Sequence, residues 1–341
     1  MLETIWFILW GILWAVYFML DGFDLGIGTL MPFLAKNDRD KRVMYNAMGP
    51  FWDGNEVWLI TAGGATFAAF PTTYAVMFSS LYTPLLIILF ALIVRGVSFE
   101  FRGKVDNPAW RTIWDFCLFI GSYIPALLFG VAFANIFAGI PIDEKGTLQG
   151  NLFTLLNPYG IAGGILFVVL FCLHGALWLA IKAEGNLQQR SAAMAQKLWI
   201  ASVVVAVVFL GYSYVATNLY ENYFKMPILW LIPGITVLAL ILIRGFISKG
   251  NWWKAWFSSC VTILGCTFFG VAGLFPNLFP SSIDPAYSLT AFNSASSPLT
   301  LKIMLVVALV MVPIVIAYQT WVYFLFKDKV TDETLAYEEA Y

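Results

Sequence analysis

Long apolar stretches alternate along the whole chain with short segments that hold most of the charged residues. A helix of about 20 apolar residues is long enough to cross the hydrocarbon core of a bilayer. These stretches greatly exceed the roughly 10-residue strands of a membrane β-barrel, which excludes that architecture. Nine apolar runs are present, at residues 5–34, 53–70, 73–94, 112–137, 159–181, 198–219, 226–247, 253–275 and 299–326.

The pattern predicts an all-α integral membrane protein with about nine transmembrane helices. The second and third runs form an almost continuous stretch at 53–94, and we expect Pro71, followed by Thr72 and Thr73, to separate them. The composition supports the same class of protein. Apolar residues make up 60% of the chain and charged residues 11%, whereas a soluble domain carries about 25% charged residues.

An internal repeat indicates how these helices are grouped. Pro84 lies eleven residues before Arg95, and Pro233 lies eleven residues before Arg244. A Trp-rich segment follows each pair, and both copies run in the same direction across the membrane. Chance similarity among apolar segments is the alternative explanation. The repeat predicts one polytopic domain with a four-helix bundle at 1–137, a second four-helix bundle at 158–275, a peripheral ninth helix at 299–326 and a cytoplasmic tail at 327–341.

The basic residues indicate the orientation of the chain. Alternate loops at 35–52, 95–111, 182–197 and 244–254, together with the segment from 327, hold 16 of the 19 Lys and Arg residues. Positively charged loops mark the cytoplasmic side of a membrane protein. We therefore expect the N-terminus outside and the C-terminus in the cytoplasm.

Composition and motif content exclude several classes of function. A net charge of −1, without a basic stripe, excludes nucleic-acid binding. The four cysteines lie in predicted spans without C-x-x-C spacing, and we interpret them as apolar core residues. His174 is the only histidine, and one histidine cannot ligate several haems, so we interpret it as a packed polar residue. The chain therefore has no self-contained catalytic or metal centre.

Two carboxylates within the first apolar run are the strongest functional candidates. An ionisable side chain at the centre of a bilayer costs at least roughly 2.5–3.5 kcal/mol, so it persists where it faces protein or water. Asp21 and Asp24 are spaced to share one helical face, and Asp21 lies about 22 Å along a helix from the basic loop. This pair indicates proton handling. Hydrogen bonding between closely packed helices is the alternative.

Three further carboxylates lie near the expected cytoplasmic ends of the next two runs. Asp53 and Glu56 open the second run, and Glu100 follows the third. The first two resemble a capping box at a helix start, or they collect protons from cytoplasmic water; the two roles are compatible. Trp52 is either an interfacial belt residue or a platform on which a quinone ring stacks.

Two arginines near the end of the third run also have two interpretations. An arginine near a helix end commonly extends to the lipid headgroups. Alternatively, Arg95 or Arg102 is a charge partner of one of the carboxylates Asp24, Asp53 and Glu100. In the fourth run, Asp115 lies one turn from Arg111, and we expect a surface ion pair between them.

Several long motifs resemble subunit II of the cytochrome bd-type quinol oxidases. The likeness extends over essentially the whole chain and is densest in the first 135 residues. The motifs that carry it are LDGFDLGIG at 20–28, WDGNEVWLITAGGA at 52–65, RGVSFEFR at 95–102, FGVAF at 129–133 and FPSS at 279–282.

The resemblance implies a role in a respiratory complex of the bacterial cytoplasmic membrane. In that family a partner, subunit I, carries two b-type haems, one d-type haem and the quinol-oxidising loop. The complex oxidises quinol and reduces O₂ to water with protons from the cytoplasm, so charge is separated without pumping. Small single-helix subunits accompany it in some members, and lipid surrounds it. The resemblance therefore implies that this chain alone binds no haem.

The resemblance also assigns roles to residues of this chain. Asp53 matches the point of proton uptake, while Asp21, Asp24 and Glu100 match relay or supporting groups, with Glu56 nearby. Trp52 matches a residue that contacts a structural quinone in some members. Two other classes of function stay open on the sequence alone. A stand-alone secondary transporter also places acids at membrane depth, and a structural scaffold needs none of these carboxylates.

Overall fold

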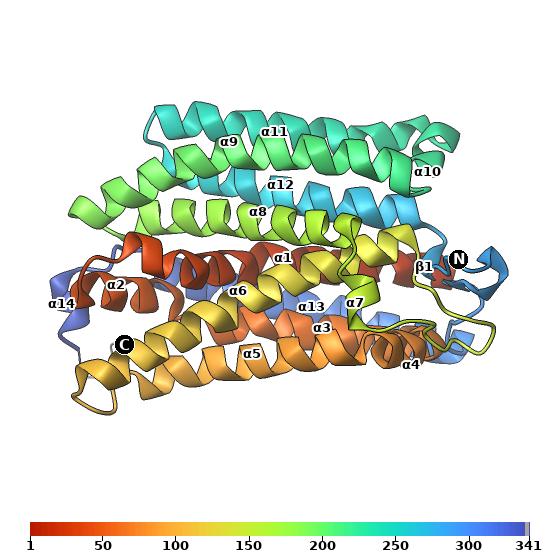
Figure 1. Cartoon of the computed structure of the whole chain (residues 1–341), viewed down its shortest axis with the longest axis horizontal. Helices are drawn as coiled ribbons and strands as arrows, with labels where there is room; N and C mark the ends of the chain where they lie inside the picture. Colours follow the sequence, from red (N-terminus) through yellow and green to blue (C-terminus); the bar gives the residue numbers. More distant parts are fainter. Residues whose placement is uncertain (338–340) are drawn as a thin grey trace.

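The computed structural model describes residues 1–337 and Tyr341, and nearly all of this chain is helical. Nine long helices among these residues overlap the predicted spans, and Figure 1 shows their arrangement. They are α1 (Leu2–Leu34), α3 (Trp52–Ala69), α5 (Tyr82–Phe101), α6 (Pro108–Ala138), α8 (Pro158–Lys182), α9 (Gly185–Ala216), α11 (Leu231–Ser248), α12 (Trp252–Leu274) and α13 (Pro298–Leu325).

Short elements connect the long helices at both ends. The helices are α2 (Asp38–Met48), α4 (Pro71–Ser80), α7 (Leu152–Leu155), α10 (Tyr220–Lys225) and α14 (Asp332–Leu335), with 3₁₀ turns η1 (Pro227–Trp230) and η2 (Pro285–Tyr287). Strands β1 (Asn277–Phe279) and β2 (Leu289–Thr290) form a small antiparallel ribbon.

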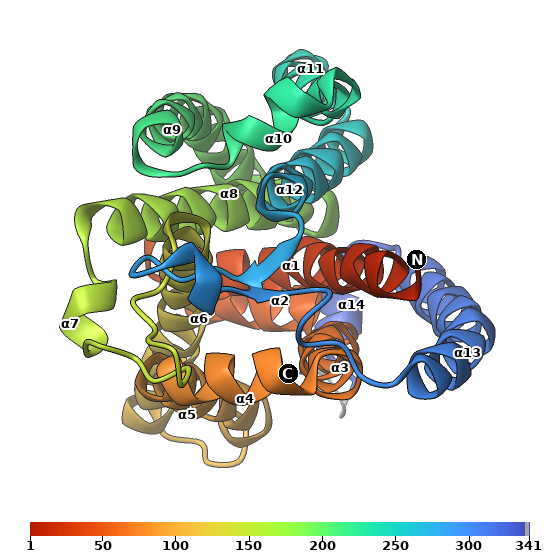
Figure 2. The ribbon, with the colours of Figure 1, turned by 90° about the vertical axis from the view of Figure 1, so that its right-hand side faces the viewer.

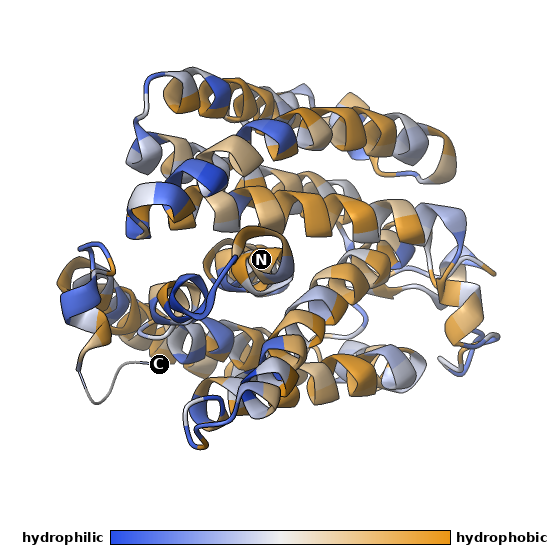
Figure 3. Cartoon of the chain, turned by 60° about the vertical axis from the view of Figure 1, so that its left-hand side comes forward, coloured by the Kyte–Doolittle hydropathy of each residue, from blue (hydrophilic) through white to orange (hydrophobic). Residues whose placement is uncertain are grey.

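The prediction of an all-α integral membrane protein is confirmed. Eight of the long helices in the described residues are apolar and long enough to cross a membrane. The ninth, α3, has 18 residues and begins with a polar turn that contains Asp53 and Glu56. Hydrophobic residues cover the long helices, while hydrophilic residues gather at the helix ends and in the loops (Figure 3).

The boundaries of the second and third runs differ in part from the prediction. Pro71 does end the second helix, since α3 stops at Ala69 and Pro71 begins α4. The predicted helix at 73–94 was wrong, because the chain turns at Leu81 and α5 continues to Phe101. Pro84 lies in the first turn of α5, and its ring would clash with the carbonyl of Ser80 in a continuous helix. Proline is tolerated near a helix start, where that clash is absent.

Three long helices begin with the same local signal. A polar residue at the N-cap accepts a hydrogen bond from the first turn, and proline follows at the first helical position. The capping residues are Asn107 for α6, Asn157 for α8 and Ser297 for α13.

Helix α1 occupies the centre of the molecule. It packs against α3, α6, α8 and α12, while α9 and α11 lie on one side and α13 lies on another (Figure 2). The N-terminus and the segment around α14 lie at opposite ends of the long axis (Figure 1). The grouping of the helices into two four-helix bundles stays a prediction, since α6 and α8, from different predicted bundles, also pack closely.

The α1–α8 contact depends on glycine. A Cβ atom at Gly26 would lie 1.8 Å from the carbonyl oxygen of Phe171, and one at Gly175 would lie 2.7 Å from the backbone nitrogen of Ile27. Small residues of this kind let the backbones of membrane helices approach closely. This packing fixes the depth and the rotation of the α1 face that carries Asp21 and Asp24.

The segment after α13 folds back over the basic end of the bundle. Lys182, at the end of α8, donates hydrogen bonds to the carbonyls of Phe326 and Asp328, and its own carbonyl accepts from Val330 at 2.8 Å. Arg42 of α2 donates to the carbonyl of Leu335 at 2.6 Å. The ends of α2, α8 and α13 on the basic side of the bundle are therefore tied together.

Gly26→Ala is expected to lower the thermal stability of the protein, because the added methyl group overlaps the backbone of α8. Overpacking of this kind typically costs about 1–3 kcal/mol. Thermal unfolding of the solubilised complex measures the change. Gly211→Ala in α9 is the matched control, since nothing lies within 4 Å of its Cβ position. Equal melting temperatures for Gly26→Ala and the wild type would contradict this account of the α1–α8 contact.

Candidate functional site

A buried ion pair joins α1 to α5. Arg95 donates two hydrogen bonds to the carboxylate of Asp21, from Nη1 at 3.1 Å and from Nη2 at 2.7 Å. Both side chains are fully buried. Glu56 of α3 approaches the same guanidinium, with its Oε2 3.9 Å from Nη1, and keeps 22% of its side chain exposed. One guanidinium therefore faces two carboxyl groups contributed by two other helices.

Asp24 lies one turn from Asp21 and has a different environment. Asn55 of α3 donates a hydrogen bond from Nδ2 to Asp24 Oδ2 at 2.7 Å. Tyr323 of α13 donates its hydroxyl hydrogen to Asn55 Oδ1 at 2.9 Å. No cation lies within ion-pair distance of Asp24 among the described residues. Asp24 is thus a fully buried carboxyl group held by an amide.

Several buried polar atoms around this cluster lack a partner among residues 1–337 and Tyr341. They include the Tyr17 hydroxyl, Asp24 Oδ1 and Arg95 Nε. A buried polar group without a hydrogen bond costs about 1–3 kcal/mol, and ordered water commonly satisfies such groups in proteins. The cluster therefore has unused hydrogen-bonding capacity beside both of its aspartates.

Asp53 and Glu100 are exposed, at the start of α3 and near the end of α5. Asp53 accepts a hydrogen bond from the backbone N–H of Gly54 at 2.7 Å. The capping box proposed for Asp53 and Glu56 is not formed, because Phe51 occupies the N-cap and Glu56 turns toward Arg95. The indole of Trp52 stacks on Phe99 at 4.9 Å, which covers one of its faces. Contact between Trp52 and a quinone stays a prediction.

The first interpretation of Arg95 was wrong, because this side chain does not extend to the headgroups. It is fully buried six residues before the end of α5, where the Asp21 carboxylate balances its charge. Asp21 was not among the partners considered for it. The sequence alone does not show which helices are neighbours, so it did not show that α1 and α5 bring Asp21 and Arg95 together.

The expectations for Arg102 and Asp115 also need correction. Asp115 is buried and accepts hydrogen bonds from Arg102 Nε at 2.7 Å and from Lys41 Nζ at 2.9 Å. Arg102 also pairs with Asp38 of α2, while Arg111 pairs with Asp106 in the adjoining loop. Arg111 therefore does not pair with Asp115. Close approach of α2 to the α5–α6 connection provides the nearer partners.

Asp38 of this second cluster lies in α2, outside the candidate membrane spans. Partial burial of Asp38 opposes its ionisation, but the hydrogen bond and the charge of Arg102 outweigh that effect and lower the pKa of Asp38 below its ordinary value. The cluster fastens α2 to the ends of α5 and α6. It does not contain the carboxylates of the candidate proton route.

The single histidine is fully occupied by protein contacts. His174 Nε2 donates to the Met19 carbonyl at 3.0 Å, and Nδ1 lies 2.5 Å from the Ser259 hydroxyl. The imidazole stacks on Trp256 at 5.2 Å. Both ring nitrogens thus have hydrogen-bond partners within the protein. Across the described residues, no group of three or more His, Cys, Asp or Glu side chains is arranged to hold a metal ion.

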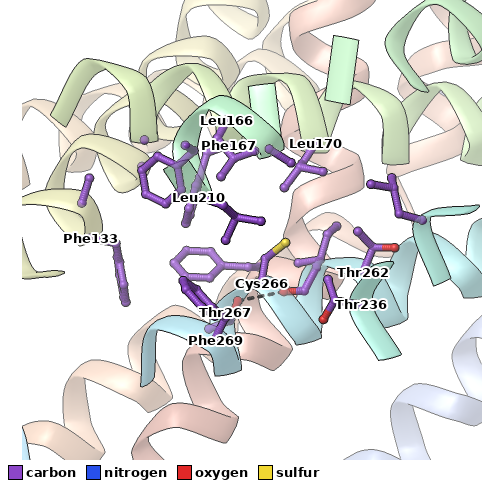
Figure 4. Close-up of a pocket in the computed structure, with 18 of the residues that line it drawn as sticks. Phe133, Leu166, Phe167, Leu170, Leu210, Thr236, Thr262, Cys266, Thr267 and Phe269 are labelled. Carbon is purple, nitrogen blue, oxygen red and sulfur yellow. Dashed lines mark hydrogen bonds between the residues drawn. The ribbon is translucent and has the colours of Figure 1, made fainter. Parts of the chain in front are cut away.

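Two apolar hollows lie away from these polar clusters. One, of about 90 Å³, lies between α6, α8, α9, α11 and α12 (Figure 4). Its three threonine hydroxyls, those of Thr236, Thr262 and Thr267, each donate to a carbonyl of their own helix, so the hollow is apolar. The other is an open groove of about 590 Å³ that includes side chains of α3, α4 and α5. Neither is lined by a carboxylate.

Comparison with known proteins gives the family. The family model described as cytochrome bd terminal oxidase subunit II matches residues 2–326. The chain belongs to this family.

Relatives of the bd oxidase subunit II family match over nearly their full lengths. The chain is 39% identical to the cytochrome bd ubiquinol oxidase subunit 2 of Bacillus subtilis, with 97% of each protein covered. It is 37% identical to the cytochrome bd-I ubiquinol oxidase subunit 2 of Escherichia coli K12, with 98% of this chain and 96% of the relative covered. A probable cytochrome oxidase subunit 2 of Haemophilus influenzae is 38% identical over 94% of this chain and 93% of the relative.

A solved bd oxidase structure has the same fold. A chain of the bd oxidase from Geobacillus thermodenitrificans matches with a TM-score of 0.78, and the match covers 95% of this chain and 98% of that chain. Its sequence identity is 15%, so this likeness supports the fold alone. The family match and the apolar helices of the described residues identify the chain as a multi-pass membrane subunit of a bd-type oxidase complex.

The structure brings three of the five predicted carboxylates into two neighbouring buried or half-buried settings, with a fourth, Asp53, exposed nearby. Asp21 and Glu56 face Arg95, Asp24 binds Asn55 one turn away, and Asp53 lies one turn before Glu56 on α3. Sequence reasoning missed two residues that contact the site. Asn55 lies inside the motif at 52–65 and was available as a signal, whereas Tyr323 lies in an apolar run that gave none.

Arg95→Gln is expected to destabilise the protein by about 3–5 kcal/mol, because it leaves the Asp21 carboxylate buried without its counter-charge. Thermal unfolding and the yield of solubilised protein measure the loss. Combining Arg95→Gln with Asp21→Asn should recover part of it, since both charges are then removed.

Arg111→Gln is the control, because Arg111 forms a solvent-exposed pair with Asp106, and such pairs contribute little. If Arg95→Gln proved no more destabilising than this control, the ion pair would not be the structural constraint that we describe.

Proposed function

We propose that this chain supports a haem-bearing subunit I and supplies a carboxylate route for protons from the cytoplasm to the site of O₂ reduction. The observation that carries the proposal is the contrast between the two buried aspartates of α1. Arg95 balances the charge of Asp21, whereas Asp24 has an amide as its partner and an unpaired oxygen. A buried carboxyl group without a fixed counter-ion is suited to binding and releasing a proton.

The proposed proton route has three stages that follow one another from the protein surface inward. Asp53 is exposed and takes up a proton from water. Glu56 follows one helical turn later on the same face of α3 and is partly exposed. The α1 aspartates lie fully buried beyond it. Transfer between these groups needs water between them, and the unpartnered Tyr17 hydroxyl and Asp24 Oδ1 are groups that bind water.

Each group has a separate role in this proposal. Asp53 collects the proton, Glu56 passes it inward, and Asp24 holds it at the inner end of the route. Asp21 and Arg95 set the electrostatic potential around Asp24 and hold α1 against α5. Glu100 adds a negative charge at the basic face, where it helps to attract protons.

The partner supplies the redox chemistry. Haems b and d of subunit I would carry electrons from quinol to O₂, and no haem is assigned to this chain because both nitrogens of His174 bind protein groups. The residues of this chain bind and release protons at carboxyl oxygens. Each step moves one proton from a donor oxygen to an acceptor oxygen, through water where the two are separated.

The proposed orientation follows from the charged residues. Asp53, Glu100, α2 and α14 share the end of the bundle where most Lys and Arg residues lie, and we place this end in the cytoplasm of a bacterial cell. The N-terminus is then outside. From the family resemblance we also propose that accessory single-helix subunits accompany the complex and that a structural quinone binds at Trp52.

A stand-alone secondary transporter is the weaker alternative. Transporter sites typically form where helices are interrupted near the middle of the membrane, whereas α1 is continuous through Asp21 and Asp24. The family match also favours the oxidase. A purely structural subunit would have no need of a buried carboxyl group without a counter-ion.

Asp53→Asn is expected to slow O₂ consumption of the two-subunit complex several-fold, because an amide cannot take up and release a proton at this position. Haem content and absorbance should stay unchanged, since Asp53 lies at the protein surface. Turnover with excess quinol, together with charge separation in vesicles, measures the effect.

Asp106→Asn is the matched control, because Asp106 is an exposed carboxylate of the α5–α6 connection with 94% of its side chain accessible. It should leave turnover unchanged. Wild-type turnover and charge separation in Asp53→Asn would refute the assignment of Asp53 to proton uptake.

A further inference from the structure

Two side chains of the last long helix, α13, form hydrogen bonds with α3, although the helix packs loosely elsewhere. Most apolar side chains of α13 face outward. Gln319 donates from Nε2 to the carbonyl of Gly54 at 2.8 Å and accepts from Trp58 Nε1 at 2.8 Å. One turn later, Tyr323 donates to Asn55 at 2.9 Å. Both contacts thus fall on the turn of α3 that carries Glu56.

The hydrogen bonds of Asn55 leave its amide a single orientation. Its Nδ2 donates to Asp24 Oδ2 at 2.7 Å and to the carbonyl of Leu20 at 3.2 Å. A backbone carbonyl accepts hydrogen bonds and cannot donate. A reversed amide would therefore place its oxygen against the Leu20 carbonyl and leave the Tyr323 hydroxyl beside an NH₂ group.

We propose that Tyr323 is a positioning residue for proton transfer at Asp24, acting through Asn55. The Leu20 carbonyl and Asp24 accept from Nδ2, and the Tyr323 hydroxyl, by donating to Oδ1, holds the amide at its opposite end, so that Nδ2 stays directed at Asp24. Asp24 Oδ2 is then occupied by a donor, and Oδ1, which has no partner among the described residues, is the oxygen at which the proton binds and leaves. This inference rests on the proposed function of Asp24.

Packing around Tyr323 makes its hydroxyl testable in isolation. The phenol ring contacts Phe51 at 4.5 Å and Trp178 at 5.8 Å between ring centroids. Tyr323→Phe keeps this ring in place and removes the donated hydrogen bond. The Asn55 amide then has no donor that fixes its oxygen, and its hold on Asp24 weakens.

Tyr323→Phe in the two-subunit complex is expected to lower O₂ consumption per haem by about tenfold, the factor that corresponds to about 1.4 kcal/mol in a barrier. The solvent deuterium isotope effect on turnover should rise, because proton transfer becomes a larger part of the rate limit. Haem content should stay at the wild-type level. Tyr318→Phe is the matched control, since Tyr318 lies on the same helix and is 61% exposed.

A second pair of variants tests whether Tyr323 acts through Asn55. Asn55→Leu should also slow turnover and raise the isotope effect, and adding Tyr323→Phe to Asn55→Leu should change neither further. An additive loss in the double variant would overturn the inference. So would a wild-type rate and isotope effect in Tyr323→Phe, or a loss of turnover that merely follows loss of haem.

Asp24→Asn separates this inference from the proposed function. Wild-type turnover in Asp24→Asn would refute the role of Asp24 and with it the role of Tyr323. Slow turnover in Asp24→Asn combined with wild-type behaviour of Tyr323→Phe would leave the proton route standing and refute only the positioning role.

Discussion

The ion pair between Asp21 and Arg95 is the interaction on which the polar part of this structure depends. A charged group at this depth is tolerated only when it is paired or faces water, and here two helices supply opposite charges that form two hydrogen bonds. The pair holds α5 at a defined position along α1. It also satisfies one of the two buried aspartates of α1, so that the other, Asp24, is distinguished by its lack of a counter-ion.

The rest of the fold supports that arrangement. Glycines at the α1–α8 contact fix the rotation of α1, and the polar contacts of α13 reach the same turn of α3 that carries Asn55 and Glu56. Ion pairs between α2 and the α5–α6 connection close the basic face around Asp115. The two apolar hollows contain no carboxylate, so the candidate proton route is separate from them.

Much of the fold was predictable, because long apolar runs indicate directly which helices lie in lipid. The break at Pro71 followed from local chemistry. The turn at Leu81 was missed because no charged residue interrupts the run there, although Ser79, Ser80 and Pro84 mark it. The carboxylates were identifiable from their cost in a membrane. Their partners were not, since the pairing of Asp21 with Arg95 and of Asp115 with Arg102 depends on which helices are neighbours. The role of Tyr323 was the hardest to predict, because an aromatic residue in an apolar run is typical of ordinary packing. Only the structure shows the hydrogen bond that its hydroxyl donates to Asn55.

The most direct test of the central claim is proton uptake during a single reaction of the reduced complex with O₂, followed in vesicles with a pH indicator on the cytoplasmic side. In an Asp24→Asn complex, our account predicts that electron transfer among the haems keeps its rate while proton uptake becomes much slower. Proton uptake at the wild-type rate in that complex would contradict the assignment of Asp24 as the proton-holding group.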